Sequence, residues 1–297
     1  MSVYNAWMNT INTHIFTGEA EEVDFARRFG GIARLYGDAA LERFRATHVC
    51  VIGVGGVGSW IVEALARSAI GQLTLIDLDN VAESNINRQI QALSGTIGQA
   101  KIGALAERIA QINPFCRVNL VEDFIAPDNL DQMIKGRGYD YVIDAIDHVK
   151  SKAALIAYCR DQAIPMLTIG SAGGQVDPTR IEVRDLSKTE QEPMLKIVRK
   201  RLRNEYGFPR SIKTKFNVDA VFSMEPLTFP AEGDSCDVDE GAAGVTGLNC
   251  AGFGSSMVVT ATFGMFAAAH LLRKLAAEAN ATATRGQTVQ PEAAALS

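Results

Sequence analysis

A glycine-rich turn in this chain is followed by two cationic side chains and several carboxylates, a combination suited to phosphate chemistry. The turn spans residues 53–58 (GVGGVG) and has the pattern G-x-G-x-x-G. Glycines in such a turn let backbone N–H groups approach phosphate oxygens at the start of a helix. The pattern alone is a weak signal, because dehydrogenases that bind NAD(P) use the same turn. We therefore expect a bound nucleotide, which is either a redox cofactor or a substrate that is consumed.

Four polar residues further along the chain favour a nucleotide that is consumed: Asn85, Arg88, Lys101 and Asp147. Arg88 is suited to bidentate contact with phosphate oxygens, Lys101 adds a point charge, and the Asp147 carboxylate is a Mg²⁺ ligand. Such a set would let a substrate carboxylate approach the anionic α-phosphate of ATP. Taken singly, Arg88 and Lys101 also fit solvated surface charges, and Asp147 also fits a helix N-cap. Their joint occurrence is what favours adenylation.

Two aspartates directly follow the second expected strand. Asp77 ends that strand and suits ribose hydroxyls, whether the nucleotide is a redox cofactor or ATP. Asp79 lies two residues later and also fits a residue that only anchors a turn. The expected nucleotide-binding set is therefore Gly53, Gly55, Gly56, Gly58, Asp77, Asp79, Asn85, Arg88 and Lys101.

The elements that must position these residues alternate along the chain. Apolar runs typical of buried strands occupy residues 49–52, 73–76, 118–121, 139–143 and 165–169. Segments with helical spacing of apolar residues separate several of them, for example residues 98–112. Continuous apolar strands alternating with helices predict an α/β fold with a Rossmann-like, mostly parallel sheet and helices on both faces. The polar residues above would then meet at the carboxyl edge of the sheet.

The pattern changes after residue 175, where a smaller C-terminal extension with added strands and a basic helix is expected. Residues 180–183 resemble a short strand, residues 196–206 a basic helix, and residues 230–249 a Gly- and Asp-rich mobile loop. We expect an irregular N-terminal extension at 1–24, followed by an ATP-binding Rossmann-like region at 25–175. Residues 176–275 belong to the same domain, and we expect them to face the substrate and to form a dimer contact. We expect residues 276–297 to be a disordered tail.

Composition narrows the classes of protein. The chain has 297 residues, 47% hydrophobic content and a formal net charge of −5, so no overall basic field attracts nucleic acid. Its five cysteines form no C-x-x-C pair, which argues against zinc and for reduced thiols. The N-terminus has no basic region leading into an apolar core, so we expect a cytoplasmic protein.

One stretch reaches membrane-spanning length without a charged residue, namely residues 251–272. It is rich in Gly, Ala, Ser and Thr, and has few large aliphatic residues. We interpret it as a loop leading into a buried core helix, with a membrane segment or membrane association as the alternative.

A local concentration of positive charge follows residue 195. It suits an RNA phosphate backbone, and an ordinary solvated helix face is the alternative. Phe208 and Phe216 nearby would either stack on unpaired bases or belong to the core. Arg210 belongs to this basic stretch, and the candidates for RNA binding within it are Lys196, Arg199, Lys200, Arg201, Arg203, Lys213 and Lys215.

The residues described above resemble the superfamily of ubiquitin-activating-type adenylyltransferases, which includes the thiamine and molybdopterin adenylyltransferases of bacteria. The resemblance implies that Asp77 contacts ribose, that Asn85, Arg88 and Lys101 contact phosphates, and that Asp147 holds magnesium. It also implies an N-terminal arginine from a partner subunit at the γ-phosphate. Arg34 is our candidate for that arginine, and Arg28 is the alternative.

Within that superfamily, the chain is most similar to the bacterial tRNA threonylcarbamoyladenosine dehydratases. The segments that carry this likeness are residues 28–37, 87–90, 152–160, 173–178 and 259–264. The resemblance implies ATP-dependent cyclisation of a threonylcarbamoyl group on tRNA, with catalysis by Arg88, Lys101, Asp147 and Arg34. It further implies a homodimer, leaves room for a bound Na⁺ or K⁺, and fits the absence of paired zinc cysteines.

Several alternatives remain open from the sequence. Activation of the C-terminus of a ubiquitin-like sulfur-carrier protein uses the same ATP residues. An NAD(P)-dependent oxidoreductase explains the glycines and Asp77 but not Arg88 or Lys101. A scaffold role with a sulfur-transfer partner is not excluded. Some relatives use a cysteine thioester, and Cys236 and Cys250 flank the Gly-rich loop. Ring closure by a tethered group requires no such thiol.

Overall fold

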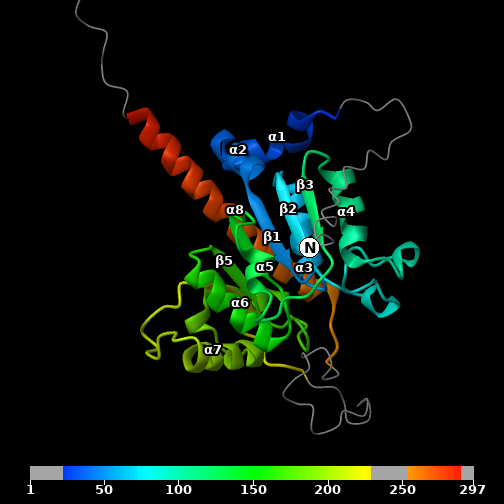
Figure 1. Cartoon of the computed structure of the whole chain (residues 1–297). Helices are drawn as coiled ribbons and strands as arrows, with labels where there is room; N and C mark the ends of the chain where they lie inside the picture. Colours follow the sequence, from blue (N-terminus) through cyan, green and yellow to red (C-terminus); the bar gives the residue numbers. More distant parts are fainter. Residues whose placement is uncertain (1–22, 229–252, 289–297) are drawn as a thin grey trace, which may run out of the picture.

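The computed structural model describes residues 23–228 and 253–288, and its centre is a seven-stranded sheet (Figure 1). The strand order is β3-β2-β1-β4-β5-β7-β6. Every neighbouring pair is parallel except β6 with β7. The strands are β1 (His48–Ile52), β2 (Gln72–Ile76), β3 (Arg117–Val121), β4 (Tyr141–Asp144), β5 (Met166–Ile169), β6 (Ile181–Asp185) and β7 (Asp219–Ser223).

The order in which the chain adds strands to the sheet reverses at β1. The chain runs from β1 outward to β2 and β3, then returns to place β4 on the other side of β1. Val49 therefore pairs with Leu73 on one side and with Tyr141 on the other. Such a reversal opens a crevice at the carboxyl ends of the two diverging strands, which is where ligands bind in open α/β sheets.

Helices cover both faces of the sheet, as the alternation of apolar strands predicted. Side chains alternate along β1, so that Val49 and Val51 join one core while Cys50 and Ile52 join the other. One core is completed by α2 (Asp38–Ala46), α3 (Gly58–Arg67), α4 (Lys101–Ile112) and α8 (Met257–Thr288). The other is completed by α5 (Leu130–Ile134), α6 (Val149–Asp161) and α7 (Pro193–Glu205). The predicted Rossmann-like fold is confirmed.

The C-terminal extension belongs to the same sheet. The predicted strand at 180–183 is β6, and the predicted basic helix at 196–206 is α7, which begins three residues earlier, at Pro193. The sequence interpretation missed β7, which inserts between β5 and β6 and pairs parallel with β5. The added strands therefore lengthen the nucleotide-binding sheet.

The predicted disordered tail at 276–297 is wrong for the residues described. Helix α8 continues through this region to Thr288, and Leu275 and Ala276 are buried in the core. It begins at Met257, within the uncharged stretch 251–272, so the loop-then-core-helix interpretation holds for the part that is described. Among residues 23–228 and 253–288, no helix combines the length and the apolar character needed to cross a bilayer.

Helix α1 (Phe25–Tyr36) precedes α2, and the two lie at the top of Figure 1, far from α7. The Phe25 ring packs edge-on against Phe115 with centroids 5.4 Å apart, just before β3 begins. Helix α1 therefore lies at the amino edge of the sheet. The predicted extension at 1–24 and the loop at 230–249 fall almost entirely outside the described residues.

Candidate active site

The glycine turn joins β1 to α3 in a tight bend that two of its glycines make possible. Gly53 has a positive φ of 81°, and a Cβ there would lie 2.9 Å from the carbonyl oxygen of Ala145. A Cβ on Gly58 would lie 1.8 Å from the carbonyl oxygen of Gly53, well inside any permitted contact. Larger residues at these two positions would force the bend open.

A cavity of about 530 Å³ opens beside this bend, at the carboxyl ends of β1, β2, β4 and β5. Its volume is in the range usual for small-molecule and cofactor sites. Most of the predicted nucleotide-binding residues line it, which confirms that these sequence positions converge; Gly58 lies just behind, at the first position of α3. The lining residues from the predicted set are Gly53, Gly55, Gly56, Asp77, Asp79, Asn85, Arg88, Lys101 and Asp147.

Asp77 ties the bend to the end of β2. Its carboxylate accepts a hydrogen bond from the Val54 backbone N–H at 2.8 Å and one from the Asp79 N–H at 2.9 Å. These bonds orient the carboxylate at the cavity wall. Each carboxylate oxygen has a second lone pair, so Asp77 can still accept from a ligand hydroxyl.

Lys101 lies at the first position of α4 with its side chain 8% exposed. Its Nζ donates to Asp79 Oδ2 at 2.6 Å, while the Asp79 side chain is 72% exposed. The ammonium group is therefore held at the cavity by an acid that faces solvent. A buried, pre-positioned cation of this kind attracts an anionic ligand strongly, because little water screens it.

Arg88 lies over the glycine turn. Its Cγ and Cδ are 3.5 Å from where a Gly56 Cβ would be, so its stem packs on the bend. Its guanidinium donates to the Ser84 carbonyl at 2.7 Å and to Asn87 Oδ1 at 2.9 Å. Asn85 is buried and its Oδ1 accepts from the Ala82 N–H at 3.0 Å. Arg88 and Lys101 thus approach one cavity from different segments.

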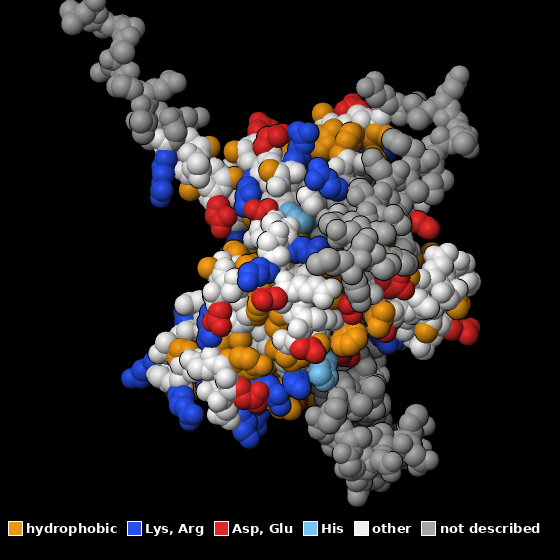
Figure 2. Space-filling view, in the orientation of Figure 1, with side chains coloured by type: hydrophobic (Ala, Val, Ile, Leu, Met, Phe, Trp, Pro, Cys, Tyr) orange, Lys and Arg blue, Asp and Glu red, His pale blue; other side chains and the backbone are white. Residues whose placement is uncertain are grey.

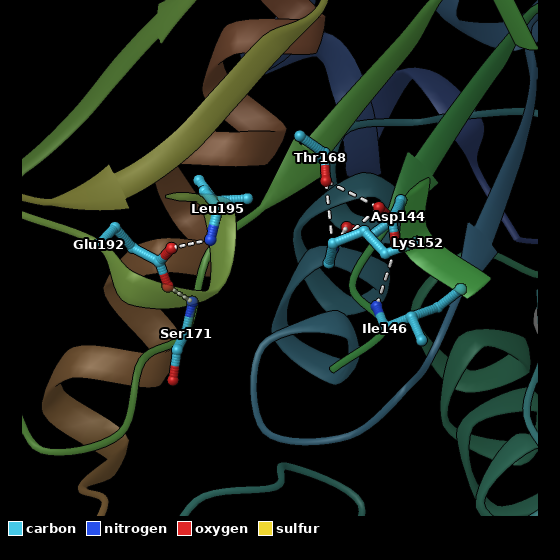
Figure 3. A network of polar contacts seen from close by, with 7 residues as sticks. All are labelled: Asp144, Ile146, Lys152, Thr168, Ser171, Glu192 and Leu195. Atoms are coloured by element: carbon cyan, nitrogen blue, oxygen red, sulfur yellow. Dashed lines mark hydrogen bonds and ion pairs between the residues drawn. The ribbon is translucent and has the colours of Figure 1, made fainter. Parts of the chain in front are cut away.

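Asp147 is exposed at the cavity on the loop that follows β4. Asp144 is the last residue of β4, and its Oδ1 accepts from the Ile146 N–H at 3.0 Å (Figure 3). Asp144 in turn pairs with Lys152 at 2.8 Å and accepts from the Thr168 hydroxyl at 2.7 Å. The side chains of Asp144, Lys152 and Thr168 are fully buried. Sequence reasoning missed Lys152 and Thr168, because nothing local marks a buried ion pair.

Glu192 is a second buried acid that the sequence interpretation missed. It caps the N-terminus of α7 by accepting from the Leu195 N–H, and its other oxygen accepts from the Ser171 N–H at 2.8 Å (Figure 3). Burial raises the pKa of the Glu192 carboxyl, and the charges of Lys152 and Arg199 oppose that shift. Ser171 itself lines the cavity.

The two candidate N-terminal arginines do not reach the cavity of their own chain. Arg34 is exposed on α1, at the amino edge of the sheet. Arg28 donates to the carbonyl groups of Gln111 and Ile112, at 3.0 and 2.8 Å, and so caps the end of α4. Arg28 therefore has a structural role here, and a contribution of Arg34 requires a second subunit.

The basic residues gather on and beyond α7, where Lys and Arg side chains crowd the lower left of Figure 2. Lys196, Lys200, Lys213 and Lys215 are exposed. Arg201 pairs with Glu205 at 3.2 Å, and Arg203 lies over the Phe216 ring. Phe208 and Phe216 are only 3% and 4% exposed, so of the two alternatives left open by the sequence, the core position is the one observed.

The described cysteines are poor nucleophiles. Cys50 and Cys159 are buried, and Cys116 is half-buried. Burial raises the pKa of Cys116 and of Cys159 to about 12, so both stay protonated near neutrality. Cys236 and Cys250, the candidates for a thioester, lie outside the described residues. Within residues 23–228 and 253–288, no three His, Cys, Asp or Glu side chains are grouped to hold a metal ion.

Comparison with known proteins gives consistent matches over most of the chain. The sequence model of the ThiF family matches residues 29–294. The tRNA threonylcarbamoyladenosine dehydratase of Haemophilus influenzae is 54% identical over 253 residues, covering 85% of this chain and 94% of that protein. The dehydratase of Escherichia coli is 53% identical, covering 85% and 95%. The crystal structure of the E. coli enzyme in complex with ATP has a TM-score of 0.77 at 50% identity, covering 88% of this chain and 99% of that one.

Proposed function

The chain belongs to the ThiF family, and on that premise we propose that it uses ATP to cyclise threonylcarbamoyladenosine in tRNA. Two observations support this proposal. The dehydratases of H. influenzae and E. coli match most of the chain at more than half identity. The cavity at the glycine turn is lined by Arg88 and a buried Lys101, the arrangement that an ATP-consuming site needs. The first observation carries the proposal, because the cavity residues favour a consumed ATP but are shared with enzymes that activate carrier proteins.

The proposed reaction has two steps, adenylation of the threonyl carboxylate and ring closure. A carboxylate oxygen of the threonyl group attacks the α-phosphorus of ATP, the bond to the β-phosphate oxygen breaks, and pyrophosphate leaves. A nitrogen or oxygen of the same threonylcarbamoyl group then attacks the activated carbonyl carbon, gives up its proton and expels AMP. The substrate has lost one water, whose oxygen is now in AMP. Tethering supplies a high effective concentration for the second step.

The side chains of the cavity have distinct roles in this proposal. The buried Lys101 ammonium and the Arg88 guanidinium offset phosphate charge, so that the anionic carboxylate can approach the α-phosphate. Backbone N–H groups of the glycine turn bind phosphate oxygens, and Asp77 accepts from ribose hydroxyls. Asp79 fixes the Lys101 Nζ by their 2.6 Å bond.

Magnesium fits the donor set at the cavity. Mg²⁺ is usually bound by one or two carboxylates together with substrate phosphates and water, and Asp147 supplies an exposed carboxylate at the cavity. When bound, the ion would neutralise phosphate charge. We propose Asp147 as its ligand. A monovalent cation, a sulfur-transfer partner and a cytoplasmic location remain predictions.

We also propose a homodimer in which Arg34 of each subunit acts at the partner's ATP. The support is geometric: Arg34 lies on α1 at the amino edge of the sheet and cannot reach the cavity of its own chain. Arg28 is already engaged by the end of α4. Mixing an Arg34→Ala chain with a chain carrying Lys101→Met tests this, because an interface of this kind would restore activity to one site of the mixed dimer.

The deciding experiment offers the purified full chain ATP with either threonylcarbamoylated tRNA or a panel of ubiquitin-like sulfur-carrier proteins. We expect AMP and pyrophosphate with the tRNA only, and a modified nucleoside lighter by one water. Formation of a carrier acyl-adenylate without tRNA turnover would assign the chain to carrier-protein activation. The absence of pyrophosphate release with both kinds of substrate would refute the ATP-dependent assignment.

A further inference from the structure

The Glu192 carboxylate joins two segments that are distant in the sequence. One oxygen accepts from the Ser171 N–H at 2.8 Å, and the other accepts from the Leu195 N–H in the first turn of α7 (Figure 3). The residue is only 4% exposed, so water does not compete for these bonds. Gly170 permits the approach, because a Cβ there would lie 3.1 Å from Glu192 Cγ.

Both joined segments belong to the cavity. Gly170 and Ser171, from the loop after β5, line it together with Met194 from the first turn of α7. This wall lies on the β5 side of the cavity, whereas Asp77 and Lys101 lie on the β2 side. Strands β1 and β4 separate the two sides. The wall is therefore where a second reactant would meet a nucleotide held by the glycine turn.

The same helix also carries exposed cations. Lys196 is exposed, and its backbone N–H donates to the carbonyl of Glu192 at 3.1 Å. Lys200 is exposed one turn further along α7. Arg199 is half-buried beside Thr189, and its positive charge favours the ionised form of the Glu192 carboxyl by lowering its pKa. A phosphate backbone bound along α7 would therefore lie on a helix whose first turn is fastened to the cavity wall.

We propose that Glu192 is a positioning residue that fastens the RNA-facing helix α7 to the loop after β5. RNA bound on α7 then places its reacting carboxylate next to the α-phosphate of ATP. The proposal rests on the RNA substrate of the proposed function. It goes beyond helix capping, because a cap would need only the Leu195 bond, and the second oxygen of Glu192 accepts from Ser171.

The test substitutes Glu192→Gln, which keeps the shape of the side chain but turns an NH₂ group towards one of the two N–H donors. Glu190→Gln is the matched control: it is exposed, two residues away, and 3.8 Å from Arg184. We expect Glu192→Gln to lower kcat with threonylcarbamoylated tRNA by about 10- to 100-fold, the value of one bond to a charged group. We expect KM for ATP and the affinity for tRNA to stay within about threefold, because Glu192 is buried and is not among the residues that line the cavity.

Hydrogen exchange of the Ser171 amide provides a readout that does not depend on turnover. In the wild type, bound tRNA should slow this exchange further, whereas in Glu192→Gln the amide should exchange faster and not respond to tRNA. A simple cap would instead lower thermal stability and leave the Ser171 response intact, which would overturn the proposal. The proposal would also be overturned if Glu192→Gln lost ATP affinity and kcat to the same extent, or if Glu192→Gln no longer bound tRNA.

The two possible failures are distinguishable. If the wild type forms no AMP with tRNA, the proposed function fails, and the exchange measurement still judges the role of Glu192. If the wild type turns over and Glu192→Gln behaves like Glu190→Gln, the inference about Glu192 alone is wrong.

Discussion

At the scale of single residues, Lys101 is the buried cation that we propose for the phosphates of ATP. Its side chain is 8% exposed, and its ion-pair partner, Asp79, is 72% exposed. The acid therefore stays solvated, while the ammonium is kept out of bulk water and acts at the cavity with little screening. An anionic ligand meets a cation that is already in place, so no reorganisation is needed when it binds.

Replacing Lys101 by methionine tests this arrangement. Methionine fills the buried space, and the exposed Asp79 loses its partner without being buried, so the melting temperature should change little. The rate of tRNA-dependent AMP formation should fall by about 10²- to 10³-fold, as for loss of one pre-positioned donor. Lys135→Met, at an exposed site just after α5, serves as control. A Lys101→Met rate close to that of the control would mean that the ammonium does not act on ATP.

The Asp144–Lys152 pair predicts a different outcome, because both side chains are fully buried. Lys152→Met leaves an unpaired buried carboxylate and should lower the free energy of unfolding by about 3–5 kcal/mol. The double variant Asp144→Leu, Lys152→Met removes both charges and should recover part of that loss. Urea denaturation measures each value, with Arg45→Met at an exposed pair expected to cost below about 1 kcal/mol. No recovery in the double variant would contradict this account.

At the scale of elements, the β1–α3 bend is the tightest junction near the cavity. Gly58→Ala places a Cβ 1.8 Å from the Gly53 carbonyl, so the first turn of α3 must move away from the bend. We expect weaker ATP binding and lower stability, both followed by ATP-dependent shifts in thermal unfolding. Gly103→Ala within α4 is the control, and it should stabilise by about 0.5–1 kcal/mol because alanine favours helix. Normal ATP binding by Gly58→Ala would exclude the bend as the phosphate site.

The junction between β7 and α8 contains an acid that responds to pH. The hydrogen bond from His270, together with Lys274, lowers the pKa of Asp219 to about 2, from an ordinary value near 4. A depressed carboxyl pKa stabilises the fold above the unfolded-state pKa, and this contribution is lost as pH falls towards 2. Because Asp219 is 30% exposed, we expect only about 1 kcal/mol.

Asp219→Asn checks that contribution. The difference in unfolding free energy between wild type and variant should be largest at about pH 5–7 and shrink as pH falls from about 4 to about 3. Chemical denaturation at a series of pH values measures it. A difference that stays constant over this range would show that the loss comes from packing and not from charge.

Strands β1 to β5 could be predicted from the sequence, because parallel strands buried on both faces are continuous apolar runs. Strand β3 lies at the edge of the sheet and is less buried than the other four. Strand β7 was missed because residues 219–223 follow a polar loop, and only pairing with β5 shows that they form a strand. The end of α8 was misjudged for a similar reason. Its last turns are rich in alanine and threonine, with few large apolar residues to mark a buried face.

The convergence of Asp77, Arg88, Lys101 and Asp147 could also be predicted, since residues that follow parallel strands meet at one edge of the sheet. The buried side chains that hold these cavity loops in place could not be predicted. Lys152 reaches Asp144 from α6, and Glu192 reaches Ser171 from the start of α7, so both contacts exist only after the helices pack. Sequence spacing carries no information about such contacts.

At the scale of the whole molecule, charge is distributed unevenly. The chain carries a net charge of −5, yet the exposed cations on and beyond α7 form a positive surface (Figure 2). An acidic protein that binds RNA must do so through such a local surface, and the resulting affinity depends strongly on salt.

Charge reversal at Lys196 and Lys200 tests this surface, since both are exposed and their replacement leaves the core intact. The affinity for tRNA should fall, and the slope of log affinity against log salt should decrease by about one for each phosphate that the variant no longer neutralises. ATP binding should not change. Lys135→Glu, just after α5, is the control. If the reversed chain binds tRNA with an unchanged slope, the RNA docks elsewhere.

Helix α8 has a consequence for how the chain tolerates shortening. Near its start, Thr260 lines the cavity and donates to the Arg88 carbonyl at 3.4 Å; near its end, Asn280 donates to the Tyr36 carbonyl, beside α1, at 3.0 Å. About twenty residues of helix separate these two contacts, a length of about 30 Å. Trimming from the carboxyl terminus would therefore loosen the α1–α2 corner long before it disturbed the nucleotide. A protease that removes the last turns, Asn280 included, should leave a chain that still binds ATP but holds the C-terminal end of α1, near Arg34, less firmly.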